Sequence, residues 1–192
     1  MTEQSTQSIP DTLQENGSRQ YLTFVLGDEE YAVNILKVRE IRVWKSITAI
    51  PNTAVFIKGV INLRGTVVPI IDLRERFGLA ARSYGPRTVV IVLSVEDGDH
   101  QRTMGLVVDA VSNVCTLTKD ETSPPPDLGS AISAEFITGL ATVDEKMLIL
   151  LDSDRLLDLE EIYAVAQVQD RERVKSDKNS ESIEATDPDR SA

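Results

Sequence analysis

Short runs of β-branched and aliphatic residues, separated by polar turns, dominate the middle of the chain. The run 21–26 (YLTFVL) is followed by the polar stretch 27–30 (GDEE), and the apolar pattern resumes over 31–33 (YAV). Such residues favour strands, and a short turn between two of these runs predicts a β-hairpin. The same pattern predicts a second hairpin, made of the run 88–93 (TVVIVL), the turn 96–100 and the run 103–107.

Helical patterns are few. The residues 35–41 are apolar at every third position, which predicts a short helical turn after the first hairpin. The segment 72–77 precedes a glycine, which is typical of helix ends, and predicts a second short helix. The longest pattern predicts a C-terminal helix over 152–168, capped at its start by Asp152 or Ser153.

Two pairs of segments repeat one another without gaps. Residues 31–41 align with 104–114 at an offset of 73 (31 to 104), and small or aliphatic residues coincide along the alignment. Residues 56–72 align with 136–152 at an offset of 80 (56 to 136). This repetition indicates two related halves that differ mainly in loop length. The expected fold is mainly β, with two small barrels of similar build and few short helices.

The two ends of the chain are polar, and the net charge is strongly negative. Residues 1–19 and 169–192 have too few apolar side chains to offset the entropy of ordering, which predicts disordered tails around a folded domain at 20–168. The net charge of −11 argues against nucleic acid or an anionic membrane surface as a partner. Without a signal-peptide pattern, a long apolar segment or a second cysteine, we expect a cytoplasmic protein with no membrane insertion.

No group of residues has the pattern of an active site. His100, the only histidine, lies in a polar turn, where the ordinary interpretation is a solvated surface residue. Cys115 lies among aliphatic residues, where an inert buried thiol is expected. No histidine–cysteine cluster has the spacing of metal ligands, and no glycine-rich phosphate motif is present. We expect a protein that is not an enzyme and that uses neither a metal nor a cofactor.

The two halves differ at two positions that carry charge in the first half. Arg64 precedes Gly65 in a tight turn where the second half has a generic polar turn, and Glu40 stands where the second half has Asn113. A pair between Glu40 and Arg64 has two interpretations. It is either a surface salt bridge worth ~0–1 kcal/mol or a polar rim, beside aliphatic residues such as Val38, that is presented to a partner. Spacing alone leaves both interpretations open.

Several stretches resemble the CheW coupling proteins of bacterial chemotaxis. The first two are 26–42 (LGDEEYAVNILKVREIR) and 56–74 (FIKGVINLRGTVVPIIDLR), and the second contains an NLRG hairpin between IKG and PIID. The stretches 105–114 and 147–152 follow in the order of that family, so the resemblance covers about 20–164. It implies two intertwined, five-stranded SH3-like β-barrels. It also implies a scaffold that couples chemoreceptors to the CheA histidine kinase.

The resemblance further implies partners and the residues that contact them. The partners are the regulatory domain of CheA and the cytoplasmic tips of methyl-accepting chemoreceptors, so a cytoplasmic adaptor would be recruited to membrane-associated arrays. The receptor helix would lie in the groove between the barrels, against Val38, Glu40, Asn62, Arg64, Gly65, Val89 and Val108. The kinase would contact Val43, Ile47 and Ile50. A second contact, between CheW copies in the array, would use Ser123 and Leu128.

Two loops depart from the family pattern. The loop 123–128 (SPPPDL) lacks the arginine and the aromatic residue that relatives often carry around its prolines, which weakens the expected second array contact. The turn 96–101 is longer than in compact relatives.

Other functions stay open from the sequence. The main alternative is a CheW-like adaptor of another kinase–receptor pathway, and a fragment of CheA would share the fold. The short segment after the core is too small for the receiver domain of a CheV protein. The acidic core argues against a small barrel that binds RNA or single-stranded DNA.

Overall fold

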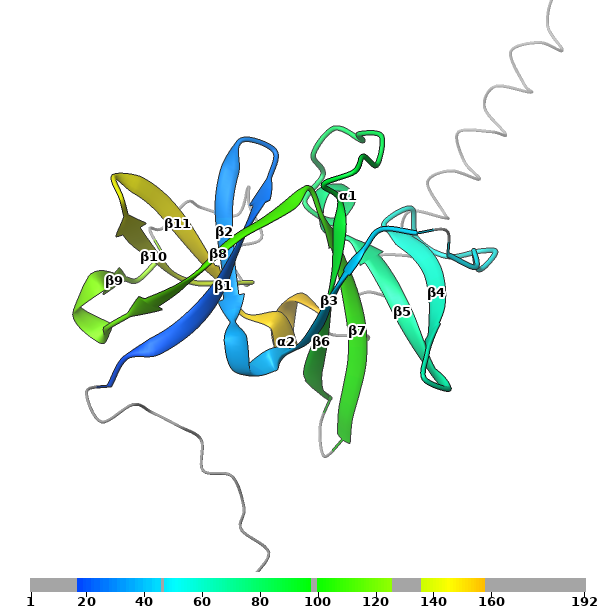
Figure 1. Cartoon of the computed structure of the whole chain (residues 1–192), viewed down its shortest axis with the longest axis horizontal. Coiled ribbons are helices and arrows are strands. Elements are labelled where there is room, and N and C mark those ends of the chain that lie inside the picture. The colour runs from blue at the N-terminus through cyan, green and yellow to red at the C-terminus, as the bar shows by residue number, and fades with distance from the viewer. Residues whose placement is uncertain (1–16, 46, 98–99, 126–135, 158–192) are drawn as a thin grey trace, which may run out of the picture.

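The computed structural model describes residues 17–45, 47–97, 100–125 and 136–157. As the sequence predicts, strands account for most of them, and they form two sheets that lie side by side in Figure 1. The strands are β1 (Arg19–Leu26), β2 (Glu29–Asn34), β3 (Val38–Val43), β4 (Ile57–Leu63), β5 (Thr66–Asp72), β6 (Val89–Asp97), β7 (His100–Val108), β8 (Ala110–Leu117), β9 (Thr122–Ser123), β10 (Ile137–Val143) and β11 (Lys146–Leu151).

Each sheet combines strands from both halves of the repeat. Sheet A has the strand order β8-β1-β2-β11-β10-β9, and sheet B has the order β3-β6-β7-β5-β4. The first hairpin, β1–β2, therefore lies among strands of the second half, and the hairpin β6–β7 lies among strands of the first half. The predicted intertwining is confirmed. Sheet A gains a sixth strand because β9 pairs with β10, whereas in sheet B Thr48 forms only an isolated bridge with Val60.

Strand pairing is equivalent in the two sheets. β11 runs parallel to β2 with Leu150 opposite Ala32, and β5 runs parallel to β7 with Ile70 opposite Gly105. The offsets of 80 (70 to 150) and 73 (32 to 105) convert one pair into the other. The sequence repeat therefore describes the structure residue by residue. We call residues related by these offsets quasi-equivalent.

Two predicted helices begin where the sequence places them. α1 (Leu73–Arg76) follows Asp72, whose carboxylate accepts the N–H of Glu75 at 3.2 Å. α2 (Ser153–Leu156) follows the quasi-equivalent Asp152, which caps its first turn in the same way. The rest of the helix predicted over 152–168 lies outside the described residues.

The helical turn predicted over 35–41 is wrong beyond its first residues. A 3₁₀ turn, η1 (Ile35–Lys37), is followed directly by β3, which pairs with β6 from Val38 to Val43. Strand pairing decides the conformation here, because the apolar spacing covers too few residues to specify a helix. A second 3₁₀ turn, η2 (Lys119–Glu121), connects β8 to β9.

Both predicted hairpins are present, with small differences in their limits. The strands β6 and β7 continue through most of the predicted turn 96–100 and pair as far as Asp97 and His100. β1 begins at Arg19, the last residue of the predicted N-terminal tail. The remaining tail residues 1–16 and 169–192 lie outside the described residues. No helix in the described part of the chain is long and apolar enough to cross a membrane.

The largest apolar cluster lies between the two sheets. It contains buried residues of both, among them Phe24, Ile91 and Leu106. A smaller apolar cluster around Leu148 is formed by residues of sheet A, and another around Val68 is formed mainly by residues of sheet B. The two sheets thus share the largest cluster of buried apolar residues among those described, so we treat them as one folding unit.

Candidate partner-binding surface

Glu40 and Arg64 meet across the seam between β3 and β4, the two end strands of sheet B. Arg64 Nη2 lies 3.3 Å from Glu40 Oε2, and Arg42 Nη1 lies 3.6 Å from Glu40 Oε1. The contact therefore joins strands at opposite ends of the sheet order. The Arg64 side chain is 86% exposed. A pair so open to solvent contributes only ~0–1 kcal/mol and leaves the guanidinium available to a partner.

The turn that carries Arg64 holds this side chain outward. Leu63 pairs with Thr66, so Arg64 and Gly65 form a two-residue loop with φ angles of +51° and +89°. Positive φ at both positions is the requirement of a type I′ hairpin turn. Asn62 Oδ1 accepts the N–H of Gly65 at 2.8 Å. Asn62 and Gly65, which the resemblance assigned to receptor contact, thus shape the turn that presents Arg64.

A hollow of ≈ 250 Å³ opens in the same seam. Its lining is aliphatic with two basic side chains, and it consists of Arg42, Val43, Lys45, Ile47, Thr48, Val60, Ile61, Asn62 and Val90. It brings together Asn62, predicted to contact the receptor, and Val43 and Ile47, predicted to contact the kinase. The lining contains no carboxylate, so the hollow suits an aliphatic or acidic group of a partner.

The two faces of β3 offer different chemistry. Ile41 and Val43 share a face with Ile91 and Val89, the β6 residues directly opposite them, and these two β6 residues belong to or pack against the inter-sheet core. Ile41 and Val43 are nevertheless 45% and 62% exposed, so this apolar face reaches solvent at the edge of the sheet. Glu40 alternates with them and points toward the seam. A partner lying along β3 would meet an aliphatic face and a charged rim together.

Val38, Val89 and Val108 do not form one exposed surface. Val38 and Val89 are half-buried, whereas Val108 is 1% exposed and belongs to the inter-sheet core. Val43, Val89 and Val108 form a row across β3, β6 and β7 that runs from the surface into the core. The prediction that Val108 lines an open groove is wrong in this structure. Val108 lies on β7, an interior strand of sheet B, and its side chain is buried in the inter-sheet core. Val108 supports Val89 from within.

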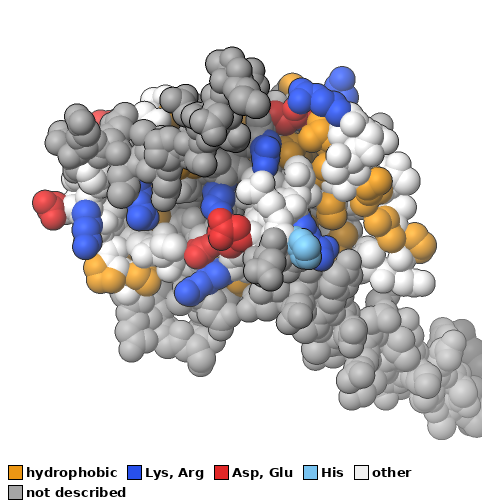
Figure 2. All heavy atoms as spheres, turned by 90° about the horizontal axis from the view of Figure 1, so that it is seen from below, with side chains coloured by type: hydrophobic (Ala, Val, Ile, Leu, Met, Phe, Trp, Pro, Cys, Tyr) orange, Lys and Arg blue, Asp and Glu red, His pale blue; other side chains and the backbone are white. Residues whose placement is uncertain are grey.

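Exposed apolar side chains gather over sheet B. In the view from below, they cover the right-hand end of the molecule, with basic side chains and His100 beside them (Figure 2). Of the residues predicted to contact the kinase, Val43 and Ile50 are exposed, and Ile47 packs against the core of sheet B. Val55, in the loop between β3 and β4, is also 66% exposed. Sequence reasoning missed Val55 because a single apolar residue in an irregular loop has no periodicity to mark it.

Trp44 lies in sequence between Val43 and Lys45, two residues that line the hollow. Its ring centroid is 4.1 Å from that of Tyr84, and its backbone N–H donates to the carbonyl of Thr88 at 3.0 Å. The Tyr84 hydroxyl donates to Asp72 Oδ2 at 2.7 Å. Burial, and then the hydrogen bond to Asp72, raise the pKa of Tyr84 well above its ordinary value. Tyr84 and Thr88, which follow α1 in the chain, thus contact Trp44 directly after the end of β3.

Replacing Tyr84 with phenylalanine is expected to lower the free energy of unfolding by about 1–2 kcal/mol, because Asp72 loses a hydrogen-bond donor. Asp72 is only 4% exposed, so water replaces that donor poorly. Urea unfolding followed by the emission of Trp44, the single tryptophan, measures the change. Tyr21→Phe, at a half-buried tyrosine of sheet A, is the control and should change stability by less. Equal midpoints for wild type and Tyr84→Phe would contradict the prediction.

Comparison with known proteins identifies the family. The family model described as "CheW-like domain" matches residues 20–161. The chain is 47% identical to Chemotaxis protein CheW of Klebsiella aerogenes over 154 residues, which is 80% of this chain and 90% of that protein. The chain belongs to the CheW family. A solved member, the scaffolding protein TtCheW of Thermoanaerobacter tengcongensis, is 36% identical, with a TM-score of 0.65 over 72% of this chain and 91% of that one.

Membership of the CheW family confirms the fold and the class of function that the sequence predicts. Probable chemotaxis protein CheW of Rhizobium etli is 40% identical over 140 residues, 73% of this chain and 88% of that protein. Relatives at this level are named chemotaxis proteins or a scaffolding protein. A chemotaxis adaptor with a mainly β, two-sheet fold is therefore established for the chain at the level of its family.

The predicted second array contact of this CheW-family chain is only partly described. Ser123 lies in β9, opposite Leu140 of β10, at the end of sheet A. Leu128 lies outside the described residues. The part that is described therefore places Ser123 on an edge strand and leaves the contact itself a prediction.

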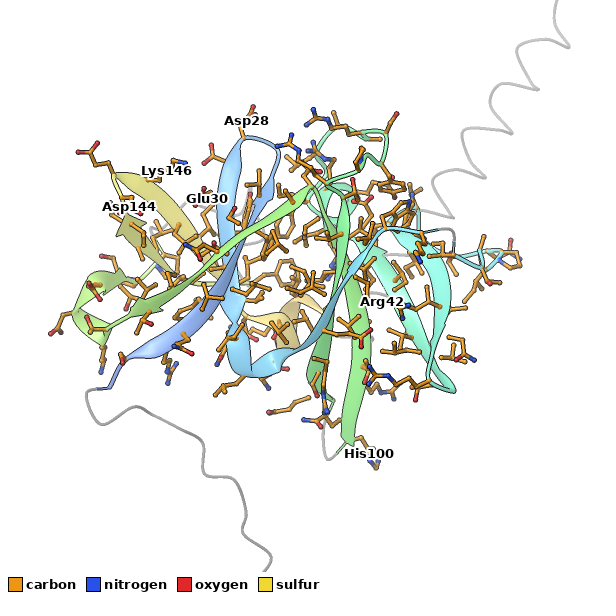
Figure 3. The ribbon with its side chains drawn as sticks, viewed as in Figure 1. Asp28, Glu30, Arg42, His100, Asp144 and Lys146 are labelled. Atoms are coloured by element: carbon orange, nitrogen blue, oxygen red, sulfur yellow. The ribbon has the colours of Figure 1, made fainter. Side chains whose placement is uncertain are left out.

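Sheet A carries acidic residues where sheet B carries Arg64. The quasi-equivalent turn consists of Asp144 and Glu145, which also have positive φ. Asp28, Glu30 and Asp144 lie at the upper left of Figure 3, with Lys146 beside them, whereas Arg42 lies on the other sheet. Lys146 Nζ is 3.4 Å from Glu30 Oε1. The two ends of this CheW fold thus present opposite charge to partners.

The described histidine, cysteine and acidic side chains bear on the chemistry expected from the sequence. Within residues 17–157, apart from the stretches not described, no group of three or more His, Cys, Asp and Glu side chains could hold a metal ion. His100 is exposed at the end of β7, as the sequence predicts. Burial raises the pKa of the half-buried Cys115, which keeps it in the poorly nucleophilic thiol form. This arrangement is consistent with a scaffold family.

Proposed function

We propose that this chain couples chemoreceptors to a CheA-type histidine kinase by binding both through sheet B and its junction with sheet A. The proposal rests on the family and on one observation. The edge strand β3 carries the exposed apolar residues Ile41 and Val43 and also Glu40, to which Arg64 of the β4–β5 turn is paired. That combination suits an amphipathic helix, whose apolar side packs on the strand while its polar side meets the charged rim.

The receptor helix is proposed to lie along β3, beside the junction of the two sheets. Val38 and Val89 provide its apolar floor, and Glu40 and Arg64 provide the rim. At ~25 cal/mol per Å² of buried apolar surface, even a small patch supplies several kcal/mol. Association entropy offsets much of this, so single contacts are weak and gain strength in an array, to which the protein is recruited at the membrane.

The kinase is proposed to dock on the seam and on the loop that follows β3. Val43 and Ile50 are exposed there, and Ile47 lines the hollow between β3 and β4. Val43 borders both surfaces, since it lines the hollow and pairs with Val89. Kinase and receptor would therefore contact adjacent surfaces of one strand. A change in one contact then alters the other through the shared residues rather than through a distant rearrangement.

The test is co-sedimentation with receptor-containing membranes and the CheA kinase of the same cell. Wild type should carry the kinase into the pellet, and Arg64→Glu should reduce receptor binding at least about tenfold, because it places two carboxylates in the rim. The matched control is Asp144→Arg, which reverses charge at the quasi-equivalent turn of sheet A and should pellet as wild type does.

Each result has a distinct meaning. Loss of binding together with a melted circular-dichroism spectrum for Arg64→Glu would show that Arg64 is structural. Equal binding by wild type and Arg64→Glu would remove Arg64 from the receptor surface. If wild type itself fails to pellet with matched partners, the coupling proposal fails and an adaptor of another kinase–receptor pathway becomes the leading function.

A further inference from the structure

An ion pair lies where the chain crosses from β7 in sheet B to β8 in sheet A. Arg74 of α1 contacts Asp109 of this crossing through Nη2, and its Nε lies 3.4 Å from Asp109 Oδ1. Asp109 Oδ2 also accepts the N–H of Gly27, from the β1–β2 turn, at 2.9 Å. The Arg74 and Asp109 side chains are 12% and 24% exposed, so the pair is largely shielded from water.

A second cluster lies where the chain crosses from β2 in sheet A to β3 in sheet B. Lys37 Nζ is 2.9 Å from Asp154 Oδ2 of α2 and 2.7 Å from Glu96 Oε1. Asp154 Oδ1 accepts the N–H of Glu96, from the β6–β7 hairpin, at 2.8 Å. Burial acts to lower the pKa of Lys37, but its hydrogen bonds to Glu96 and Asp154 outweigh burial and raise it. The ammonium group therefore stays charged.

The two clusters lie at corresponding crossings of the two halves and have opposite polarity. Arg74 and Asp154 are related by the offset of 80 (74 to 154). Asp109 is related by the offset of 73 to Leu36, the residue before Lys37 (36 to 109). In both clusters a residue of a short helix pairs with the crossing, and an aspartate also binds a hairpin N–H. The helix residue is basic at the first crossing and acidic at the second.

In the observed fold each half's first hairpin lies among strands of the other half, and we call this the exchanged arrangement. We propose that the inverted polarity at the crossings selects it. If each half kept its own hairpin, β5 would lie beside β2 instead of β7, and β11 would lie beside β7 instead of β2. The helix α1 would then bring Arg74 to Lys37, and α2 would bring Asp154 to Asp109. Like charges would meet at both crossings, whereas opposite charges meet at both crossings in the exchanged fold.

Apolar burial discriminates poorly between the two arrangements. Quasi-equivalent positions carry similar side chains, such as Val33 with Leu106 and Ile41 with Val114. Either hairpin therefore presents a similar apolar face to either set of remaining strands. Charges at the crossings differ in sign between the halves, and repulsion between partly buried like charges is costly. The charge pattern thus supplies a distinction that the apolar pattern lacks.

The experiment compares three charge patterns in the full chain. The neutral variant is Arg74→Gln with Asp154→Asn, and the helix-swapped variant is Arg74→Glu with Asp154→Lys. The fourfold variant adds Lys37→Glu and Asp109→Lys to the helix swap, which restores opposite charges between helix and crossing at both places of the exchanged fold. All three variants carry Glu96→Gln, because Glu96 contacts Lys37 at 2.7 Å and would otherwise face the new carboxylate of Lys37→Glu.

A disulfide reports the topology directly. All proteins carry Cys115→Ser, Gln20→Cys and Thr116→Cys, since Gln20 and Thr116 are exposed partners of β1 and β8. Directly opposite residues of antiparallel strands are within reach of a disulfide. These strands are neighbours only when the hairpins are exchanged. The crosslinked monomer that forms after refolding from urea is measured on a non-reducing gel.

We expect the helix-swapped variant to yield about tenfold less crosslinked monomer than the neutral variant, and the fourfold variant to recover most of that loss. The comparison is made against the neutral variant because all three lose native hydrogen bonds. A helix-swapped yield equal to the neutral yield would overturn the proposal. So would a fourfold variant that is no better than the helix-swapped one, since the damage would then come from the individual residues and not from their pairing.

Discussion

Replacing Gly59 with alanine is expected to lower the free energy of unfolding by about 4 kcal/mol, the sum of backbone strain and steric overlap. The φ angle of Gly59 is +136°, a conformation that residues with a side chain rarely adopt. A Cβ atom at this position would lie 2.1 Å from the carbonyl oxygen of Thr48. That atom belongs to the backbone, so no side-chain rotation relieves the overlap.

The substitution also acts on the proposed kinase surface. Thr48 and Val60 exchange two backbone hydrogen bonds, of 2.8 and 3.0 Å, directly beside Gly59. These bonds hold the start of the loop that carries Ile47 and Ile50 against β4. A Cβ atom on Gly59 pushes this loop away from the sheet. We therefore expect loss of kinase binding together with the loss of stability.

Urea unfolding monitored by circular dichroism measures the effect. Gly139→Ala is the matched control, because Gly139 is quasi-equivalent and its Cβ would lie 2.8 Å from the carbonyl oxygen of Ser123, a milder overlap. Gly85→Ala, with nothing within 4 Å, should stay within about 0.5 kcal/mol of wild type. A midpoint for Gly59→Ala as high as that for Gly85→Ala would show that the loop yields without cost.

The repeat is the feature that sequence predicts best. Ungapped alignment of the halves anticipates the pairing of Leu150 with Ala32 and of Ile70 with Gly105 once the topology is known. It does not anticipate which half supplies which hairpin. The apolar patterns of the halves are interchangeable, so the exchange followed only from the family resemblance. The charges that distinguish the crossings, at Lys37 and Asp109, look like ordinary surface residues in the sequence.

The candidate site was predictable to the extent that it departs from the repeat. Glu40 and Arg64 stood out because their quasi-equivalents are Asn113 and Asp144, and the structure brings them within 3.3 Å. Their role in binding stays a prediction. The hollow could not be foreseen, because Val60 and Ile61 have the pattern of ordinary strand residues. The hollow lies between β3 and β4, the two end strands of sheet B, so it depends on how the whole sheet is folded.

Errors in prediction came from segments where local pattern and tertiary pairing disagree. The spacing of Ile35, Val38 and Ile41 is helical, yet pairing with β6 makes a strand of the last two. Val108 has the aliphatic character of a groove residue, yet its strand is enclosed by neighbours on both sides. In both cases the decisive partner lies on another strand, 55 residues away for Val38 (38 to 93) and 19 residues away for Val108 (89 to 108), beyond the reach of a local pattern.

Arg76, a partly buried residue of α1, packs over two rings of the inter-sheet core. Its replacement by alanine is expected to lower the free energy of unfolding by about 3 kcal/mol, because cation–π contacts and a hydrogen bond are lost. Its guanidinium carbon lies 5.1 Å from the ring centroid of Phe56 and 5.0 Å from that of Phe136. Phe56 and Phe136 are quasi-equivalent, so one cation bridges matching rings of the two halves. Its Nε also donates to the carbonyl of Leu156 at 3.3 Å.

Leu156 is the quasi-equivalent of Arg76, and this asymmetry gives the test its controls. Arg76→Leu supplies the apolar side chain that the repeat uses on the other side, so it should recover part of the stability lost in Arg76→Ala. Arg155→Ala removes an arginine of α2 that is 70% exposed, and it should stay within about 0.5 kcal/mol of wild type. Thermal and urea unfolding measure all three variants. If Arg76→Ala and Arg155→Ala have the same unfolding midpoint, the apolar cluster alone joins the sheets. If Arg76→Ala unfolds at a much lower temperature and urea concentration than Arg155→Ala, the Arg76 guanidinium contributes to joining the two halves at their shared core.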